Sequence, residues 1–373
     1  MSSPANPRVR RVFRLLVWSL CGTVVLVSAA GIVLKVQRVR EMFHPWLPIY
    51  VKEPGHERTG HFYLFDETLG WRNVPNWSAK TRGQPLTINS RGLRDREYTL
   101  DKPPGIKRLL VLGDSFAWGY GVGDDDIFTE VLERRFESER RPWQVVNTGV
   151  SGWGTDQQYL FLKSEGFEYQ PDVVLLAFYL LNDPKEVRLS DVYGLSKPVF
   201  LDTDLTLGNV PVPLPSQRKA GIESPVEHLE LVVRVIEEIE RECRKRNCRL
   251  VVMKFGRFVD PTFQGLSDVE QKFESKFARL RDRVPYLDLD EEFQKRKLRT
   301  KFLVAGNEDN HWNDFGHEQV GVILGEFLEQ HGLLGLGGQP KSEPQSRESG
   351  SCIARCEGHR GAGVVRSTGA RLP

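Results

Sequence analysis

Three short stretches hold the residues best suited to chemistry, and two of them directly follow long apolar runs. Gly113-Asp114-Ser115 follows RLLVL, and Asn182 follows DVVLLAFY within LLNDP. Further along, GNEDNHWNDFGHEQVG places acids beside His311. A serine becomes a nucleophile when a base lies within hydrogen-bond reach, an acid orients that base and donors face the developing oxyanion. The pattern indicates acyl chemistry, the alternative being that Gly-Asp-Ser is only a turn.

The elements that must position these residues follow from the apolar runs. Continuous apolar strands separated by helices are typical of a parallel sheet covered on both faces, so we expect a three-layer α/β domain. Ligands of such sheets bind at the carboxyl ends of the strands, where Ser115 and Asn182 are expected. The predicted strands are 108–113, 143–147, 172–179, 249–255 and 286–289, and the predicted helices are 126–139, 155–166, 224–246, 268–282 and 315–331. The helix from Ser224 is expected to start with a capping box closed by Glu227.

Taken in order, four blocks resemble the SGNH (GDSL) hydrolase superfamily over about residues 108–330. They are Gly-Asp-Ser, the glycine-rich NTGVSGWG, Asn-Asp, and an acid followed by His-x-Asn-x-x-Gly-His. The resemblance implies a flavodoxin-like parallel sheet and ester chemistry with no cofactor. It assigns Ser115 as nucleophile, His311 as general base and Asp309 as the acid that orients it. The N–H groups of Ser115 and Gly152 and the Asn182 amide would form the oxyanion hole.

Some positions depart from the family pattern or have other interpretations. Leu180 stands where the third block usually has glycine. Glu308 is the alternative to Asp309 as the orienting acid, since family members place the acid two or three residues before the histidine. His317 is expected to be a packing or capping residue. Asp309, His311, Asp314 and His317 could ligate a metal, although the serine hydrolase pattern accounts for them without one, so no metal is expected. Trp118, Trp153 and Trp312 adjoin the blocks and either wall the site or pack.

The charge distribution separates the ends of the chain from its body. Of 373 residues, 27% are charged and the net charge is +2, but the first forty residues hold seven basic residues and no acid. Residues 1–14 are a basic segment, and residues 15–34 are an uncharged run long enough to span a bilayer. We expect a transmembrane anchor there, with a cleaved signal peptide as the alternative. The intervening body is mildly acidic, which excludes a nucleic-acid partner. We expect a single-pass membrane protein with its catalytic domain on the extracytoplasmic side.

The remaining boundaries follow from composition. Residues 41–107 form a small accessory segment of short strands, 108–335 the hydrolase domain, and 338–373 a disordered tail. The GWRN and NSRGLRD stretches of residues 41–107 resemble those of membrane-anchored bacterial members of the superfamily. Within the domain, 183–222 is a long excursion over the carboxyl edge of the sheet. Cys243 and Cys248 could pair if the body is exported.

The leading expectation is a serine esterase that hydrolyses an acetyl or acyl ester of an envelope glycan or lipid. An acyltransferase acting on an envelope polysaccharide is the near alternative, because both reactions pass through an acyl-serine. A catalytically silent envelope-binding protein is the alternative from another class. The substrate itself is not encoded in any motif.

Overall fold

The computed structural model describes residues 51–52, 63–81, 83–218, 220–259, 266–306 and 309–335. The predicted anchor at 15–34 and the tail at 338–373 lie outside these residues. Within the described part, no helix combines the length and apolarity needed to cross a bilayer.

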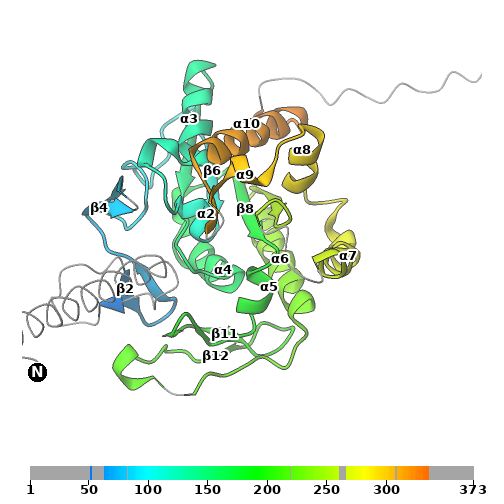
Figure 1. Ribbon diagram of the computed structural model, residues 1–373. Helices are drawn as coiled ribbons and strands as arrows, with labels where there is room; N and C mark the ends of the chain where they lie inside the picture. Colours follow the sequence, from blue (N-terminus) through cyan, green and yellow to red (C-terminus); the bar gives the residue numbers. More distant parts are fainter. Residues whose placement is uncertain are drawn as a thin grey trace, which may run out of the picture. The chain divides into compact units, whose positions relative to one another are not determined.

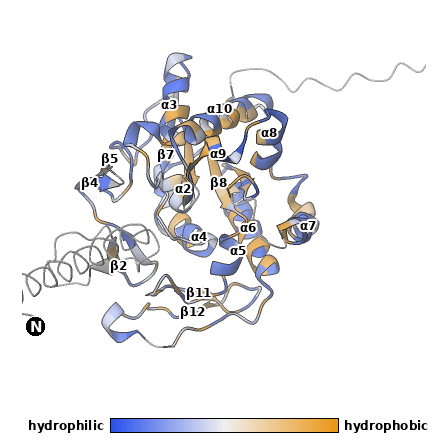
Figure 2. Ribbon diagram, viewed as in Figure 1, coloured by the Kyte–Doolittle hydropathy of each residue, from blue (hydrophilic) through white to orange (hydrophobic). Residues whose placement is uncertain are grey.

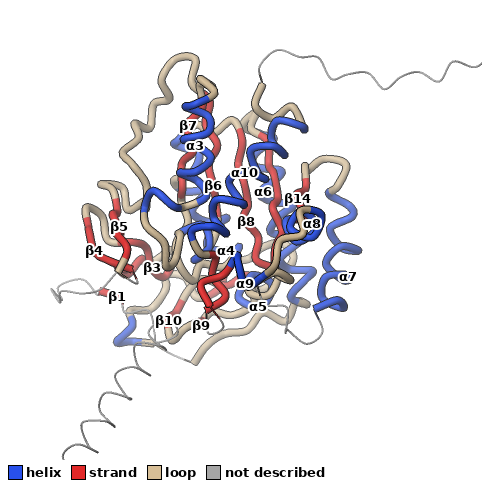
Figure 3. Tube along the Cα trace, turned by 45° about the horizontal axis from the view of Figure 1, so that its top comes forward, coloured by secondary structure: helices blue, strands red, loops and turns tan. Residues whose placement is uncertain are grey.

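A five-stranded parallel sheet forms the centre of the domain, and its strands match the predicted apolar runs within a residue or two. The strands stand in the order β14-β13-β8-β6-β7. In chain order this is the 2-1-3-4-5 arrangement of flavodoxin-like folds, so the predicted sheet is confirmed. Figure 3 shows these strands side by side with helices on both sides. The five strands are β6 (Lys107–Leu112), β7 (Trp143–Asn147), β8 (Val173–Tyr179), β13 (Arg249–Phe255) and β14 (Tyr286–Asp288).

Two layers of helices cover the sheet (Figure 1). On one side α3 (Phe128–Ser138) packs against α10 (Asp314–Gln330), and on the other α4 (Thr155–Ser164) and α7 (Leu266–Phe277) pack against α6 (His228–Lys245). The strands β6 and β8 are apolar and central, while the helices carry polar outer faces (Figure 2). Every residue of β8 is buried, which explains why its sequence does not alternate. The short helices are α2 (Ser115–Trp118), α5 (Asp183–Glu186), α8 (Leu289–Lys295) and α9 (Thr300–Leu303).

The accessory segment consists of short strands, as its turn-bounded sequence predicts. An antiparallel pair joins β2 (Tyr63–Asp66) to β3 (Gly70–Asn73), with β1 (Val51–Lys52) alongside β2. A second hairpin joins β4 (Trp77–Thr81) to β5 (Gln84–Ile88). The excursion after α5 holds two small hairpins, β9 (Asp191–Val192) with β10 (Leu195–Ser196) and β11 (Val199–Phe200) with β12 (Leu207–Gly208).

One prediction of local structure is wrong. Helix α6 begins at His228, and its cap is Glu227, whose carboxylate accepts the N–H groups of Leu229 and Glu230. Ser224 instead donates its backbone N–H to Arg188 O, which holds it in the preceding extended segment. A longer carboxylate three residues on therefore replaces the serine as the cap.

The suggested pairing of Cys243 and Cys248 is absent from the structure. Both residues are buried free thiols. The Cys248 thiol donates to the Cys243 carbonyl at 3.3 Å, where α6 turns toward β13.

Candidate active site

Ser115 and His311 are 196 positions apart in the sequence and meet at the carboxyl edge of the sheet. Ser115 is the first residue of α2, immediately after β6, and Asp114 caps that helix by accepting the Phe116 N–H at 2.9 Å. His311 lies in β16 (Asp309–Trp312), which pairs with β15 (Val304–Gly306). The Ser115 Oγ and His311 Nε2 are 2.7 Å apart. This is the hydrogen bond that a serine nucleophile needs with its general base.

Aromatic rings hold the His311 imidazole from two directions. Its ring centroid lies 4.8 Å from that of Phe116 and 4.7 Å from that of Tyr120. Phe116 in turn packs against Trp312 at 4.8 Å. Since ring packing restricts rotation of the imidazole, Nε2 stays directed at the serine.

The glycine-rich block NTGVSGWG, residues 147–154, packs tightly against α2, the helix that begins with Ser115. A Cβ on Gly149 would lie 2.6 Å from the Trp118 backbone nitrogen, so only glycine fits at this contact. Val150 donates its N–H to Gly113 O at 3.3 Å, which ties the loop to the turn before Ser115. Gly152 has a φ of +79°, in the left-handed region that favours glycine. Its role as oxyanion donor stays a prediction from the resemblance.

Asn182 follows β8, and its side-chain amide lies beside the Asp114 carboxyl. Burial raises the pKa of Asp114 to about 6, against the lowering effect of the Phe116 N–H, His311 and the Asn182 amide. The Asn182 Nδ2 donates to the Tyr193 hydroxyl at 3.0 Å. The unusual Leu180 keeps its N–H on Phe255 O at 3.0 Å, so the backbone stays attached to the neighbouring strand before it turns.

The orienting acid is not decided by the structure. Asp309 is the first residue of β16, but its side chain lies outside the described part, and Glu308 is outside the described residues altogether. The assignment of Asp309 therefore stays a prediction.

His317 has a structural role. Its Nδ1 accepts the N–H of Phe128, the first residue of α3, at 3.2 Å, and the two rings stack. Burial lowers the pKa of His317 to about 3, so the ring stays neutral and serves as an acceptor. The prediction of a packing or capping residue is confirmed.

Among the described residues, no three His, Cys, Asp or Glu side chains are grouped so as to hold a metal ion.

Tryptophans link the accessory segment to the catalytic blocks. Trp71 in β3 donates its indole N–H to Ser151 O at 3.1 Å, and Trp153 donates to Trp71 O at 2.9 Å. Trp118 donates to Asn73 Oδ1 at 3.1 Å. Trp118, Trp153 and Trp312 are all at most 2% exposed, so all three pack. In the sequence, the Gly-Trp-Arg-Asn stretch is the signal that points to a link between the accessory segment and the catalytic blocks.

A second link is Arg94, which is buried in the accessory segment. Its guanidinium donates to the carbonyls of Pro85, Trp118, Gly119 and Val122 and pairs with Asp124 at 3.0 Å. Burial lowers the pKa of Arg94, against the effect of Asp124. Planar, multiply bonded arginine is suited to fixing irregular backbone, and here it holds the turn after the nucleophile helix.

Four buried carboxyl groups stand behind the oxyanion candidates. Besides Asp114 they are Asp156 on α4 and Asp183 and Glu186 on α5, and each has one oxygen without a hydrogen-bond partner. Burial raises the pKa of Glu186 to about 8 and that of Asp183 well above its ordinary value. Lys197 from the excursion, fully buried, forms an ion pair with Asp156.

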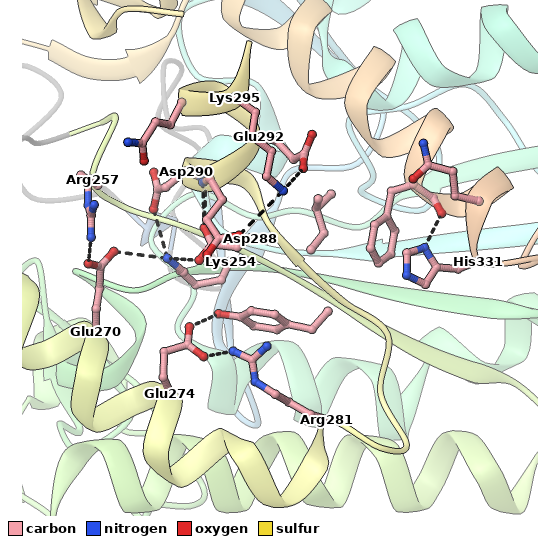
Figure 4. A pocket seen from close by; sticks show the side chains of 16 residues that line it. Lys254, Arg257, Glu270, Glu274, Arg281, Asp288, Asp290, Glu292, Lys295 and His331 are labelled. Carbon is pink, nitrogen blue, oxygen red and sulfur yellow. Dashed lines mark hydrogen bonds and ion pairs between the residues drawn. The ribbon is translucent and has the colours of Figure 1, made fainter. Parts of the chain in front are cut away.

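A conspicuous pocket lies elsewhere, next to β13, β14, α7 and α8 (Figure 4). Lys254 in its floor pairs with Glu270, Asp288 and Asp290 at 3.2, 2.8 and 3.3 Å. Because β8 and β13 separate β14 from β6, the pocket is remote from Ser115. Two further ion pairs, Arg257 with Glu270 and Arg281 with Glu274, lie in the same lining.

The fold and the serine–histidine pair define a serine hydrolase of the α/β class. The family model of the GDSL-like lipase/acylhydrolase family matches residues 111–319, which contain the whole site. The chain belongs to this family and is an SGNH-type hydrolase that acts on ester bonds. No curated protein matches the chain.

Solved structures of esterases are similar at low identity. The lipase/acylhydrolase from Enterococcus faecalis is 14% identical, with a TM-score of 0.39 over 61% of this chain and 97% of that one. Esterase EstA from Pseudoalteromonas sp. is 12% identical, with a TM-score of 0.39 over 60% and 98%. The acetyl xylan esterase AlAXEase is 13% identical, with a TM-score of 0.38 over 58% and 97%.

Proposed function

We propose that Ser115 and His311 catalyse hydrolysis of an acetyl or acyl ester of an envelope glycan or lipid. The observation that carries the catalytic part is the 2.7 Å contact between the Ser115 Oγ and the His311 Nε2. In that geometry the imidazole accepts the hydroxyl proton as Oγ attacks the acyl carbon.

The reaction proceeds in two steps, acylation of Ser115 and then hydrolysis of the acyl-serine. Attack by Oγ forms a tetrahedral oxyanion, which the Ser115 and Gly152 N–H groups and the Asn182 amide are assigned to stabilise. The protonated His311 then gives its proton to the leaving alcohol as the ester C–O bond breaks, and an acyl-serine remains. Water, deprotonated by His311, releases the acid and restores the serine. Asp309 would hold the other imidazole nitrogen throughout.

Tyr120 beside the histidine and two exposed phenylalanines elsewhere on the domain support a substrate with sugar rings or an acyl chain. Tyr120 is half-buried against His311. Phe302 on α9, which precedes β15, and Phe315 at the start of α10, which follows β16, are 54% and 41% exposed. Rings of this kind present a rigid apolar face to sugars and lipids alike.

The envelope location rests on the sequence of residues 1–34. An uncharged run preceded by four arginines would anchor the protein with its catalytic domain outside the cytoplasm. Fusion of a reporter that is active only after export, placed at residue 338, tests this orientation. A stable but inactive fusion would reverse it.

The catalytic proposal predicts that Ser115→Ala abolishes turnover of p-nitrophenyl esters without changing the thermal midpoint, since only the nucleophile is lost. A fluorophosphonate should label the parent protein at Ser115 and leave the variant unlabelled. Activity against esters of increasing chain length separates acetyl from longer acyl substrates. Product analysis with and without a glycan acceptor distinguishes hydrolysis from acyl transfer. Labelling elsewhere, or an active Ser115→Ala protein, would overturn the assignment.

A further inference from the structure

Tyr193 occupies an unusual backbone conformation at the tip of the β9–β10 hairpin. The turn has two residues, Tyr193 and Gly194, with φ values of +52° and +79°. Positive φ at both central positions is the type I′ arrangement, which favours Asn-Gly. A tyrosine in the left-handed region carries backbone strain. Asparagine would adopt this backbone conformation more easily than tyrosine, yet a tyrosine occupies the position.

The tyrosine hydroxyl connects two side chains of the catalytic edge. It accepts the Asn182 Nδ2–H at 3.0 Å and donates to the Glu186 carboxylate. Glu186 is buried one turn along α5, and its own N–H bonds the Asn182 carbonyl at 3.1 Å. The contacts form a chain in which amide, hydroxyl and carboxyl each have a fixed direction.

This chain restricts the donor that the proposed function places in the oxyanion hole. The terminal torsion of asparagine is broad, so a free amide would sample many orientations. Asn182 begins α5 but makes no side-chain cap to it. With one amide N–H bound to Tyr193, the amide plane is set, and the amide lies beside the carboxyl of Asp114, the residue before Ser115. Donors oriented before reaction are the ones that stabilise an oxyanion most.

The residue that follows the same hairpin also supports the loop that carries Gly152, another predicted oxyanion donor. Lys197 follows β10, is fully buried and pairs with Asp156. Asp156 lies at the start of α4, four residues after Gly152. Residues 191–197 thus contact Asn182 and the helix that follows Gly152, and these two residues are two of the three predicted oxyanion donors.

We propose that Tyr193 is a positioning residue, through which the β9–β10 hairpin orients the Asn182 amide for catalysis. The inference rests on the proposed function, because it acts through Asn182 as an oxyanion donor. It gives the excursion at 183–222 a part in the chemistry rather than only in covering the sheet.

Tyr193→Phe tests the proposal, since it keeps the ring and removes the hydroxyl. We expect kcat for p-nitrophenyl acetate to fall about tenfold, a fraction of the 10²–10³-fold effect of deleting a whole donor, with KM changed less than twofold. In an Asn182→Ala background the same substitution should have no further effect. Tyr193→Asn, suited to the turn and too short to reach Asn182, should fold and lose kcat equally. Tyr286→Phe is the matched control, because its hydroxyl also donates to a carboxylate, Glu274, at 2.5 Å, in the remote pocket of Figure 4.

The outcomes separate this proposal from the function beneath it. If Asn182→Ala lowers kcat but both Tyr193 variants stay within twofold of the parent, the positioning role is wrong and the oxyanion assignment stands. A full tenfold loss from Tyr193→Phe in the Asn182→Ala background would also overturn it, as the effect would not pass through Asn182. If Asn182→Ala itself keeps full kcat, the donor role and the proposal fail together, and Ser115 labelling still reports on the nucleophile.

Discussion

Two groups of buried ionisable residues lie next to the same sheet. They differ in whether the carboxyl oxygens have hydrogen-bond or ion-pair partners. Around Lys254, three carboxylates from three elements surround one ammonium, and none of them has an oxygen among the described buried atoms that lack a partner. Behind Ser115 stand four buried carboxyl groups, of which Asp156 pairs with Lys197, and each of the four leaves one oxygen without a partner among the described residues.

In this protein the group at the remote pocket is balanced, in that its carboxylate oxygens have partners, and the group behind the candidate site is unbalanced, in that each carboxyl has an oxygen without one in the described part of the chain. An unpaired buried carboxyl costs stability, so it is retained where a nearby reaction uses it or where its proton is kept. The balanced group around Lys254 only joins β13 to α7 and α8. Changing a charge at the catalytic edge should therefore alter turnover, and changing one at the balanced group should alter stability.

The largest effect beyond the nucleophile is expected from Asp309. Asp309→Asn should lower kcat by about 10⁴-fold, the scale seen when a triad acid becomes an amide, because the imidazole is no longer held in the right tautomer. Glu308→Gln, its sequence neighbour, should cost far less. Steady-state kinetics of the two variants decides the matter. The reverse ranking transfers the role to Glu308, and two mild effects would leave Ser115 and His311 working as a dyad.

At the balanced group, Lys254→Met should lower the free energy of unfolding by about 3–5 kcal/mol, because it leaves Asp288 and Asp290 without their cation. The kcat of the folded protein should be unchanged. Lys295→Met is the control: its side chain is 65% exposed beside Glu292, so we expect less than about 0.5 kcal/mol. Chemical denaturation measures both. Equal midpoints for the two variants would show that the buried lysine does not hold the pocket together.

The smallest effect concerns the pH dependence of stability at the unbalanced group. Burial raises the pKa of Glu186 from 4.5 to about 8, in contact with Tyr193 and near Asp114, Asp156, Asp183 and Lys197. The folded protein thus holds a proton that the unfolded chain releases, so the contribution of Glu186 to stability is fully present below pH 4.5 and is lost as pH rises through about 8.

Glu186→Gln keeps an acceptor for Tyr193 and removes this titration. We expect the unfolding free energies of variant and parent to agree near pH 5, and the variant to be more stable by on the order of 2 kcal/mol near pH 9. Denaturant midpoints across this range provide the measurement. Parallel curves for the two proteins would mean that Glu186 is not a protonated buried acid.

Much of the fold could be predicted because the strands of a parallel sheet are apolar throughout. RLLVL, WQVVN and RLVVMKF needed no partner information to be identified, and Gly-Asp-Ser at the end of the first run placed the serine. The start of α6 could not be predicted, since the choice between Ser224 and Glu227 as cap depended on the bond from Ser224 to Arg188 in another element. The free state of Cys243 and Cys248 likewise depended on how the turn between α6 and β13 directs each thiol.

The sequence by itself determined where the sheet strands lie along the chain, the nucleophile block and the histidine block, because these depend on local apolar runs and on residues adjacent in the chain. Only the tertiary structure decided which distant residues support them. Trp71 and Arg94 join the nucleophile and glycine-rich loops from a segment that precedes the sheet, and Tyr193 reaches Asn182 from a hairpin beyond it. Hydrogen bonds of this kind leave no periodicity in the sequence, since each depends on two backbones that folding alone brings together.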